Sequence, residues 1–263
     1  MKYAFVDGGY LREYYREAMR AFFGEEGALD FNLVRNALDA QKLFYYDSID
    51  EEPKPGESED ETRIRAEAMR IALDRIQASS GCHVRMGSMA GSAKRKRQKQ
   101  VDVLLAVELL THAFRENLDQ AALLAGDLDF KPVVDSLIGL GTWVEVRYVR
   151  SHAAAGLLAA ADQQTEINLV TFYQWSEQHF QRTHPFPNAL GVARGVPGGW
   201  HIVDRGRLNE RDALLLRHDD GLHAIQVSRY FDTNDLQVSF KDQAKLAQYF
   251  EMVYGDITWA GRP

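Results

Sequence analysis

The feature that most constrains the fold of this chain is a short apolar run, residues 121–125 (AALLA), followed at once by Gly126-Asp127-Leu128-Asp129. An apolar run of this length that ends in turn residues is typical of a strand buried on both faces. The apolar residues from Val101 to Leu109 have helical spacing, so the sequence predicts a helix and then a buried strand. In a parallel α/β sheet, ligands bind in the crevice beyond the carboxyl ends of the strands. We therefore expect the two carboxylates to lie in that crevice.

Two interpretations of Asp127 and Asp129 are open. Either residue could cap the helix predicted to begin near Phe130, since Asp is a preferred N-cap. One aspartate is enough for a cap, however. Crowded carboxylates repel each other and persist mainly where a cation or a basic ligand neutralises them. The pair therefore favours a metal site over a simple cap.

The composition is that of a soluble globular protein. At 263 residues, the chain is long enough for one large domain with a small appendage. The single cysteine, Cys82, excludes an internal disulfide framework and a cysteine-rich zinc site, and it fits a reducing cytoplasm. The apolar run at 153–161 is too short to span a membrane, and the first residues lack the apolar core of a signal peptide. We therefore expect a cytoplasmic protein.

Charge is unevenly distributed along the chain. The net charge of −7 argues against a protein that coats nucleic acid nonspecifically. Residues 50–61 carry seven acids against one lysine, and their Pro and Gly residues predict a flexible, solvated loop. Residues 94–99 (KRKRQK) carry five bases in six positions and are expected in a loop that enters the helix at Val101. A solubilising loop and a phosphate-binding loop are both open for this basic run.

Strand and helix patterns alternate over the first 181 residues. The predicted strands are 2–6, 42–49, 82–89, 120–125, 142–149 and 166–170, and the predicted helices are 10–23, 30–40, 62–79, 101–117, 130–140, 153–161 and 171–181. This alternation predicts an α/β fold with a mostly parallel sheet and helices on both faces. Asp7 follows the first strand and precedes Gly8-Gly9, so it is expected at the same sheet edge as Asp127 and Asp129.

The composition changes near residue 184. The segment 184–199 is rich in Pro and Gly and predicts a linker between a domain at 1–183 and a smaller one at 200–263. Strands predicted at 200–204, 213–218, 222–230 and 236–240 precede an amphipathic helix at 241–254, which together indicate a small α+β appendage. This appendage offers aromatic and basic residues but no catalytic constellation. We expect it to select substrate or to bind a protein partner or a second copy of the chain.

Three sequence blocks, in this order, resemble the NYN domain, a branch of the PIN-like metal-dependent nucleases. They are FVDGGYL at 5–11, KQVDVLLAVELL at 99–110 and ALLAGDLDFKPVVDSLIGLGTWVEV at 122–146, with a weaker fourth block, SHAAAGLLAAAD, at 151–162. The resemblance covers about residues 1–175 and leaves the appendage unexplained. It implies a PIN-like (Rossmann-like) fold and a metal-dependent nuclease that prefers RNA over DNA, with endonucleolytic cutting of RNA as the expected activity.

The resemblance also implies a set of site residues. The carboxylates implied to be catalytic and to hold Mg²⁺ or Mn²⁺ are Asp7, Asp102, Asp127 and Asp129. Asp162 matches a further acidic family position, although it could equally cap the last segment of the domain. Asp102 opens a helix, where an acid is also a favourable dipole partner. Glu108 matches a family position but lies about 120° around the helix from Asp102, so we interpret it as lying at the surface or behind the metal ligands.

The basic run acquires a role from the same resemblance. The residues expected to contact nucleic-acid phosphates are Lys94, Arg95, Lys96, Arg97 and Lys99. Lys99 matches a family lysine, while a solvated position in a basic loop is the alternative. Tyr10 departs from the family, in which many members have Asn three residues after the first Asp, and this departure removes any substrate contact made by such an Asn.

Oxygen-only ligands suit Mg²⁺ or Mn²⁺, either of which can activate water and neutralise a phosphodiester. Two other functions are open. A nucleic-acid-binding module without turnover would need none of the four acids, yet all are present. A phosphatase or phosphotransferase with an aspartyl nucleophile would carry its DxD pair after the first strand, where this chain has Asp7 alone.

Overall fold

The protein is seen in a computed structural model that describes residues 1–87, 94–229 and 234–261, with no description of the side chains of 94–99. The described residues form two compact units. The first contains Met1–Glu17, Ala28–Ile167 and Gln174–Glu177, and the second contains Ala18–Gly27, Asn168–Tyr173 and the described part of Gln178–Pro263. The domain boundaries predicted at 183 and 199 remain a prediction.

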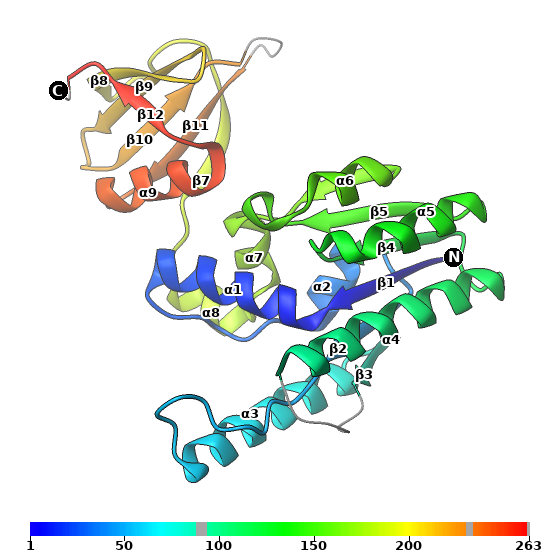
Figure 1. Cartoon of the computed structure of the whole chain (residues 1–263). Coiled ribbons are helices and arrows are strands. Elements are labelled where there is room, and N and C mark those ends of the chain that lie inside the picture. Colours follow the sequence, from blue (N-terminus) through cyan, green and yellow to red (C-terminus); the bar gives the residue numbers. More distant parts are fainter. Residues whose placement is uncertain (88–93, 230–233, 262–263) are drawn as a thin grey trace. The chain divides into compact units, whose positions relative to one another are not determined.

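The first unit is built on a parallel sheet, as predicted (Figure 1). Its described strands have the order β3-β2-β1-β4-β5-β6. Their bounds are β1 Lys2–Asp7, β2 Lys42–Asp47, β3 Cys82–Met86, β4 Gln120–Leu124, β5 Trp143–Tyr148 and β6 Gln163–Glu166. From β1 the chain proceeds to one side through β2 and β3, and then returns to the other side through β4, β5 and β6. The strand order therefore reverses between β1 and β4, where Val6 pairs with Leu124.

Helices flank this sheet. Their bounds are α1 Gly8–Phe23, α2 Phe31–Ala37, α3 Glu59–Ala78, α4 Lys94–Phe114, α5 Lys131–Gly139 and α6 Ala155–Ala160, with short 3₁₀ turns at Leu128–Phe130 (η1) and Arg150–His152 (η2). Phe5, Phe44 and Leu123 share a core with Leu105 of α4 and Leu137 of α5. The strand residues of opposite orientation, such as Ala4, Val6 and Leu43, are also fully buried. Both faces of the sheet are thus covered, which explains why its central strands are apolar runs instead of alternating patterns.

The second unit contains an antiparallel sheet with the order β12-β8-β9-β10-β11-β7 among its described strands. Their bounds are β7 Asn188–Ala193, β8 Trp200–Leu208, β9 Arg211–His218, β10 His223–Val227, β11 Asn234–Phe240 and β12 Ile257–Trp259, and the helices are α7 Leu169–Trp175, α8 Gln178–Thr183 and α9 Gln243–Tyr254. Helix α9 packs on β10 and β11 and buries Leu246, Tyr249 and Phe250. Tyr249 lies in an aromatic cluster with Phe22 and Phe186.

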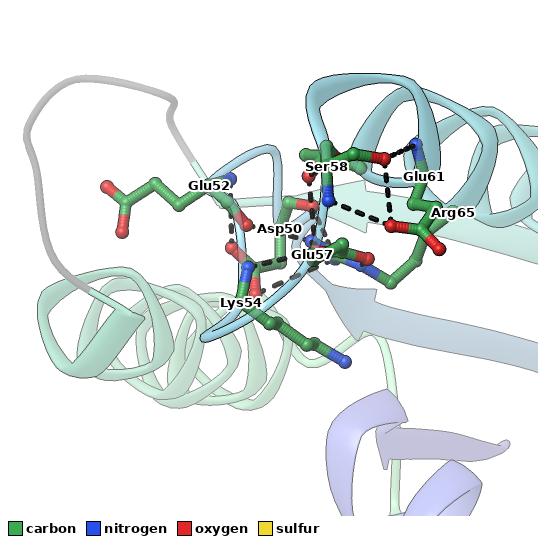
Figure 2. Close-up of polar contacts among 8 residues, drawn as sticks. Asp50, Glu52, Lys54, Glu57, Ser58, Glu61 and Arg65 are labelled. Carbon is green, nitrogen blue, oxygen red and sulfur yellow. Dashed lines mark hydrogen bonds and ion pairs between the residues drawn. The ribbon is translucent and has the colours of Figure 1, made fainter.

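Three local expectations were wrong. The last strand of the parallel sheet is Gln163–Glu166, whereas 166–170 was predicted, because this edge strand is polar and the apolar residues that follow begin α7. The segment predicted as a linker contains β7, a largely exposed strand that pairs with β11. The backbone of the basic run is helical from Lys94 instead of forming a loop. The acidic segment is a loop up to Ser58, as predicted, and Arg65 donates hydrogen bonds to its carbonyl oxygens (Figure 2). Its flexibility stays a prediction.

Candidate active site

Asp7 is the last residue of β1, at the point where the strand order reverses. Its side chain is 8% exposed, and its Oδ1 accepts a hydrogen bond of 3.0 Å from the backbone N–H of Tyr10. Burial raises the pKa of Asp7 to about 6, against the lowering effect of the Tyr10 N–H, and the nearby carboxylate of Asp47 raises it further. A carboxylate this poorly solvated is a position where a bound cation gains strongly from electrostatic attraction.

Asp47 ends the neighbouring strand β2 and was not among the predicted site residues. It is 4% exposed, forms an ion pair with Arg12 of α1, and accepts a hydrogen bond of 3.2 Å from the hydroxyl of Tyr45. Burial raises the pKa of Asp47, and the Arg12 guanidinium counteracts that rise. The signal that could have revealed it is the sequence KLFYYD, in which a buried strand ends in Asp as β1 does.

Gly8 brings these groups close together. A Cβ at Gly8 would lie only 2.6 Å from Cε1 of Tyr45 and 2.7 Å from Oδ2 of Asp47. The Tyr45 hydroxyl also donates to the carbonyl oxygen of Gly8 at 3.2 Å. The glycine after Asp7 therefore has a steric role, since it lets α1 begin directly against the end of β2.

Asp127 and Asp129 follow β4 and are both exposed. Oδ1 of Asp127 accepts a hydrogen bond of 3.0 Å from the backbone N–H of Asp129, so Asp127 caps the turn η1. Asp127 thus caps a turn, as the capping interpretation proposed, but the turn is η1 and not the helix α5, whose first position follows Phe130 without a side-chain cap. Asp129 has no side-chain hydrogen bond or ion pair with any residue that the structure describes, so the cap does not account for it. The second carboxylate keeps the metal interpretation open.

Gly126 and Tyr10 close the turn between these acids and α1. A Cβ at Gly126 would overlap the carbonyl oxygen of His152 and lie 2.5 Å from Cε2 of Tyr10. The Tyr10 hydroxyl accepts a hydrogen bond of 2.8 Å from the backbone N–H of Val149, and Ala154 N–H donates to the Gly126 carbonyl at 2.9 Å. Tyr10, the departure from the family pattern, therefore ties α1 to the segment that follows β5.

The remaining predicted acids lie in different surroundings. Asp102 is half-buried on α4, next to the buried Val101. Asp162 precedes β6 and accepts a hydrogen bond of 2.8 Å from Val144 N–H, which places it at the amino-terminal edge of the parallel sheet, opposite to Asp7. Glu108 accepts hydrogen bonds from the Tyr46 hydroxyl at 2.7 Å and from Nε of Arg85 at 3.0 Å. Glu108 thus has a structural ion pair.

Comparison with protein families identifies the domain. The NYN domain matches residues 38–168, a range that includes Asp102, Asp127 and Asp129 and begins after Asp7. The chain carries an NYN domain. It is thereby related to the PIN-like nucleases, and a nucleic acid is the substrate class of that family.

This chain is similar to a protein of unknown function from Vibrio parahaemolyticus, which has a crystal structure. The two sequences are 19% identical, and the match has a TM-score of 0.42 and covers 64% of this chain and 92% of that one. The comparison with curated proteins gives no match. In the described part of the chain, no helix combines the length and apolar character needed to cross a membrane.

The metal site of this NYN domain stays a prediction. Within residues 1–87, 94–229 and 234–261, no three Asp, Glu, His or Cys side chains converge closely enough to hold a metal ion. The donor chemistry nevertheless fits Mg²⁺ or Mn²⁺, because Asp7 and the exposed Asp129 supply hard oxygen atoms at the ends of adjacent strands. The side chains of Lys94, Arg95, Lys96, Arg97 and Lys99 lie outside the described residues, so their predicted phosphate contacts are not observed.

Proposed function

We propose that this NYN domain is a metal-dependent nuclease that hydrolyses phosphodiester bonds, with RNA favoured over DNA and cutting within the strand. The observation that supports it most directly is the buried carboxylate of Asp7 at the reversal point of the parallel sheet, next to the strand that ends in Gly126-Asp127. Ligands of open α/β sheets bind at such reversal points. The NYN match supports the same chemistry independently of this geometry.

The proposed metal ligands are Asp7, Asp102, Asp127 and Asp129. The backbone N–H of Tyr10 donates to Asp7 and orients its carboxylate. The backbone N–H of Asp129 donates in the same way to Oδ1 of Asp127. Asp102 is included because of its family position. Asp162 is left out, since it binds a backbone N–H at the other edge of the sheet. When bound, Mg²⁺ or Mn²⁺ supplies neutralisation of the phosphate and a lower pKa for the attacking water.

The residues around these acids set the shape and the charge of the site before any metal binds. Gly8 and Gly126 allow α1 and the segment after β5 to approach the strand ends closely. Arg12 compensates the charge of Asp47, so the uncompensated negative charge is concentrated on Asp7 and on the exposed acids of η1. The basic side chains of residues 94–99, Lys99 among them, are proposed to bind the phosphates of the substrate backbone.

The decisive experiment is a cleavage assay with labelled RNA and DNA, together with a phosphomonoester as control. A nuclease cuts RNA, DNA or both when Mg²⁺ or Mn²⁺ is present and stops when the metal is chelated. Release of phosphate from the monoester alone would instead indicate the DxD phosphatase. Binding of RNA or DNA without cleavage under any of these conditions would overturn the proposal in favour of a binding module.

The binding module is the second candidate, and one observation favours it: the described acids do not converge on a metal-sized centre.

The second unit is proposed to position the substrate or to bind a protein partner or a second copy of the chain. No catalytic group is assigned to it, because the NYN match ends at residue 168, before the strands of its sheet begin.

A further inference from the structure

Helix α4 of the first unit is apolar on two opposite sides. It lies along one face of the parallel sheet, where it contacts β1 and β2 (Figure 1). Its inner side carries Val101, Leu105 and Leu109, which are buried in the core. The outer side of a surface helix normally carries polar and charged residues, because it faces solvent. The outer side of α4 does not follow this rule.

Four apolar residues form a stripe along the outer side of α4. Val103 is 61% exposed, Val107 is 54% exposed and Phe114 is 69% exposed, and the half-buried Leu110 lies between them. At about 100° per residue, these four side chains fall within an arc of roughly 60° on the side away from the core. We call this surface the α4 stripe. It is one contiguous apolar surface and not a set of scattered exposed residues.

The surroundings of the α4 stripe are uncharged. The residues of the outer side between positions 100 and 114 are Gln100, Val103, Ala106, Val107, Leu110, Thr111 and Phe114. The two carboxylates of this stretch, Asp102 and Glu108, lie on other sides of the helix, and Glu108 pairs with Arg85. Two copies of a chain with a net charge of −7 repel each other, unless they meet at a surface that carries no negative charge. The α4 stripe is such a surface.

Helix α3 shows the ordinary arrangement. Ile64 and Ile71 are also exposed there, but charged residues accompany them on the same side of the helix. Asp60 and Glu67 lie four residues before and three residues after Ile64, and Arg75 lies four residues after Ile71. Single apolar residues among charges need no binding partner. Helix α3 therefore supplies a matched control for α4.

The spacing within the α4 stripe indicates that its occupant is a helix. Val103, Val107, Leu110 and Phe114 are separated by four, three and four residues, which is the spacing of the seam between two paired helices. The stripe extends over roughly 16 Å of helix. An extended strand or a loop would not match this periodicity.

The charges at the two ends of α4 favour an antiparallel partner of the same sequence. Residues 94–99, at the beginning of the helix, carry five bases, whereas the exposed acids Glu116 and Asp119 follow its end together with Arg115. A parallel pair of α4 helices would bring the two basic runs to the same end. An antiparallel pair brings each basic run towards the acids of the other copy, and it also opposes the two helix dipoles.

We propose that the α4 stripe binds the α4 stripe of a second copy of the chain, with the two helices antiparallel around a two-fold axis between Glu108 and Leu109. In this register, Val103 meets Phe114 of the second copy, and Val107 meets Leu110. Each contact pairs a smaller side chain with a larger one and is made twice, as in an isologous dimer. The inference goes beyond the proposed nuclease function and does not depend on it.

The first test measures the oligomeric state of full-length protein by sedimentation equilibrium at concentrations up to about 100 μM. The parent should be a dimer. Val103→Lys and Val107→Lys should each raise the Kd of the dimer at least about 100-fold, because two unpaired ammonium groups enter an apolar contact. Phe114→Ala, which adds no charge, should raise it at least about tenfold. Ile64→Lys on α3, where the side chain is 67% exposed, is the matched control and should dimerise as the parent does.

The second test determines the orientation of the helices. Val103→Cys and Phe114→Cys, mixed and treated with a short bis-maleimide, should form a cross-linked heterodimer. Val103→Cys alone should not cross-link, because the two copies of position 103 lie roughly 16 Å apart along an antiparallel pair. The parent, whose single Cys82 is buried, gives the background.

A parent that is monomeric at every concentration would overturn the inference, and a helix of another protein would then be the candidate occupant. A dimer that persists in Val103→Lys and Val107→Lys, with folding verified by circular dichroism, would overturn it as well, because the contact would lie on another surface. Dissociation of Ile64→Lys to the same extent would have the same consequence. Efficient cross-linking of Val103→Cys to itself would overturn the antiparallel arrangement.

Discussion

The two sheets of this protein place their acids differently. In the parallel sheet, β1 and β2 each end in a buried aspartate, and the exposed Asp127 and Asp129 follow β4. In the antiparallel sheet, Asp235 is the second residue of β11, and its Oδ2 accepts a hydrogen bond of 2.8 Å from Gln226 of β10. Neighbouring parallel strands end at one edge, whereas neighbouring antiparallel strands end at opposite edges. Parallel topology therefore puts the acids that end β1 and β2 side by side at one edge, whereas Asp235 stands near the beginning of its strand.

The largest effect expected from this difference concerns catalysis. Asp127→Asn or Asp129→Asn should lower metal-dependent cleavage more than about 100-fold, because each removes a proposed ligand carboxylate. Asp235→Asn, which changes an acid of the antiparallel sheet in the same way, should leave the cleavage rate within about twofold of the parent. Single-turnover cleavage of labelled RNA measures both.

A further control comes from the same helix region as the site. Asp135→Asn removes an exposed acid of α5 that pairs with Lys131 and should cut normally. Without metal, both site variants should unfold at the parental temperature or above it, since a charge repulsion is relieved. Full activity of Asp127→Asn and Asp129→Asn would place the chemistry elsewhere.

The next effect is on the pH dependence of stability. The pKa of Asp7 rises from 3.8 in the unfolded chain to about 6 in the fold, mainly because of burial. The folded state therefore keeps a proton that the unfolded state has lost, and stability falls as pH rises from about 4 to about 6. The loss at neutral pH is about 3 kcal/mol.

Asp7→Asn should abolish this part of the pH dependence in metal-free protein. Urea unfolding between pH 4 and pH 7 measures it, as the difference between parent and variant at each pH. A parental profile for Asp7→Asn would show that Asp7 ionises in the fold as easily as in the unfolded chain.

A smaller effect is expected from steric crowding at the strand end. Gly126→Ala should lower the free energy of unfolding by about 2 kcal/mol and impair cleavage, because the new Cβ meets the carbonyl of His152 and the ring of Tyr10. Gly191→Ala in β7 is the counterpart in the other sheet, where the nearest atom would be 3.7 Å away. It should be tolerated within about 0.5 kcal/mol. Equal costs for the two substitutions in urea unfolding would contradict the close approach at Gly126.

The smallest effect compares the helix caps of the two units. Ser58→Ala removes the capping box of α3, and Asp242→Ala removes the cap of α9, each at about 1 kcal/mol. Asp242 accepts from Ala244 N–H at 2.9 Å and from Lys245 N–H at 3.1 Å, whereas Ser58 accepts from Glu61 N–H at 3.3 Å. Asp242→Ala should therefore cost at least as much. Asp242→Asn, which keeps an acceptor, should recover most of the loss, and no recovery would argue against the cap.

The strongly patterned parts of the fold could be predicted from the sequence. Buried strands β1, β2 and β4 are apolar runs that end in Asp or Gly, so both their existence and their carboxyl ends could be recognised. Exposed strands carry no such pattern. Strand β7 has one half-buried residue and lies in a segment rich in Pro and Gly, so neither an apolar run nor an alternation marks it in the sequence. The polar edge strand β6 was placed too late in the chain for the same reason.

The site could be predicted in part. Asp7, Gly126 and Asp127 belong to short motifs at strand ends, and the structure places them at the reversal point. Asp47 and Arg12 could not be connected by sequence spacing, because their ion pair joins the end of one strand to a helix 35 residues away. A cavity between α1 and α3 is lined by Ala68 and Ala72 of α3. It could not be predicted, because sequence spacing does not show that α1 lies opposite these two small side chains.

Arg65 makes the order of an entire surface segment depend on one side chain. Its guanidinium holds the carbonyls of Asp50 and Glu52 and the carboxylate of Glu57, across a stretch whose composition is that of a disordered chain. The segment should therefore unfold locally as one unit instead of residue by residue. In hydrogen exchange, its amides would share one opening rate, and replacement of Arg65 by a residue with a single donor would make that rate rise for all of them together.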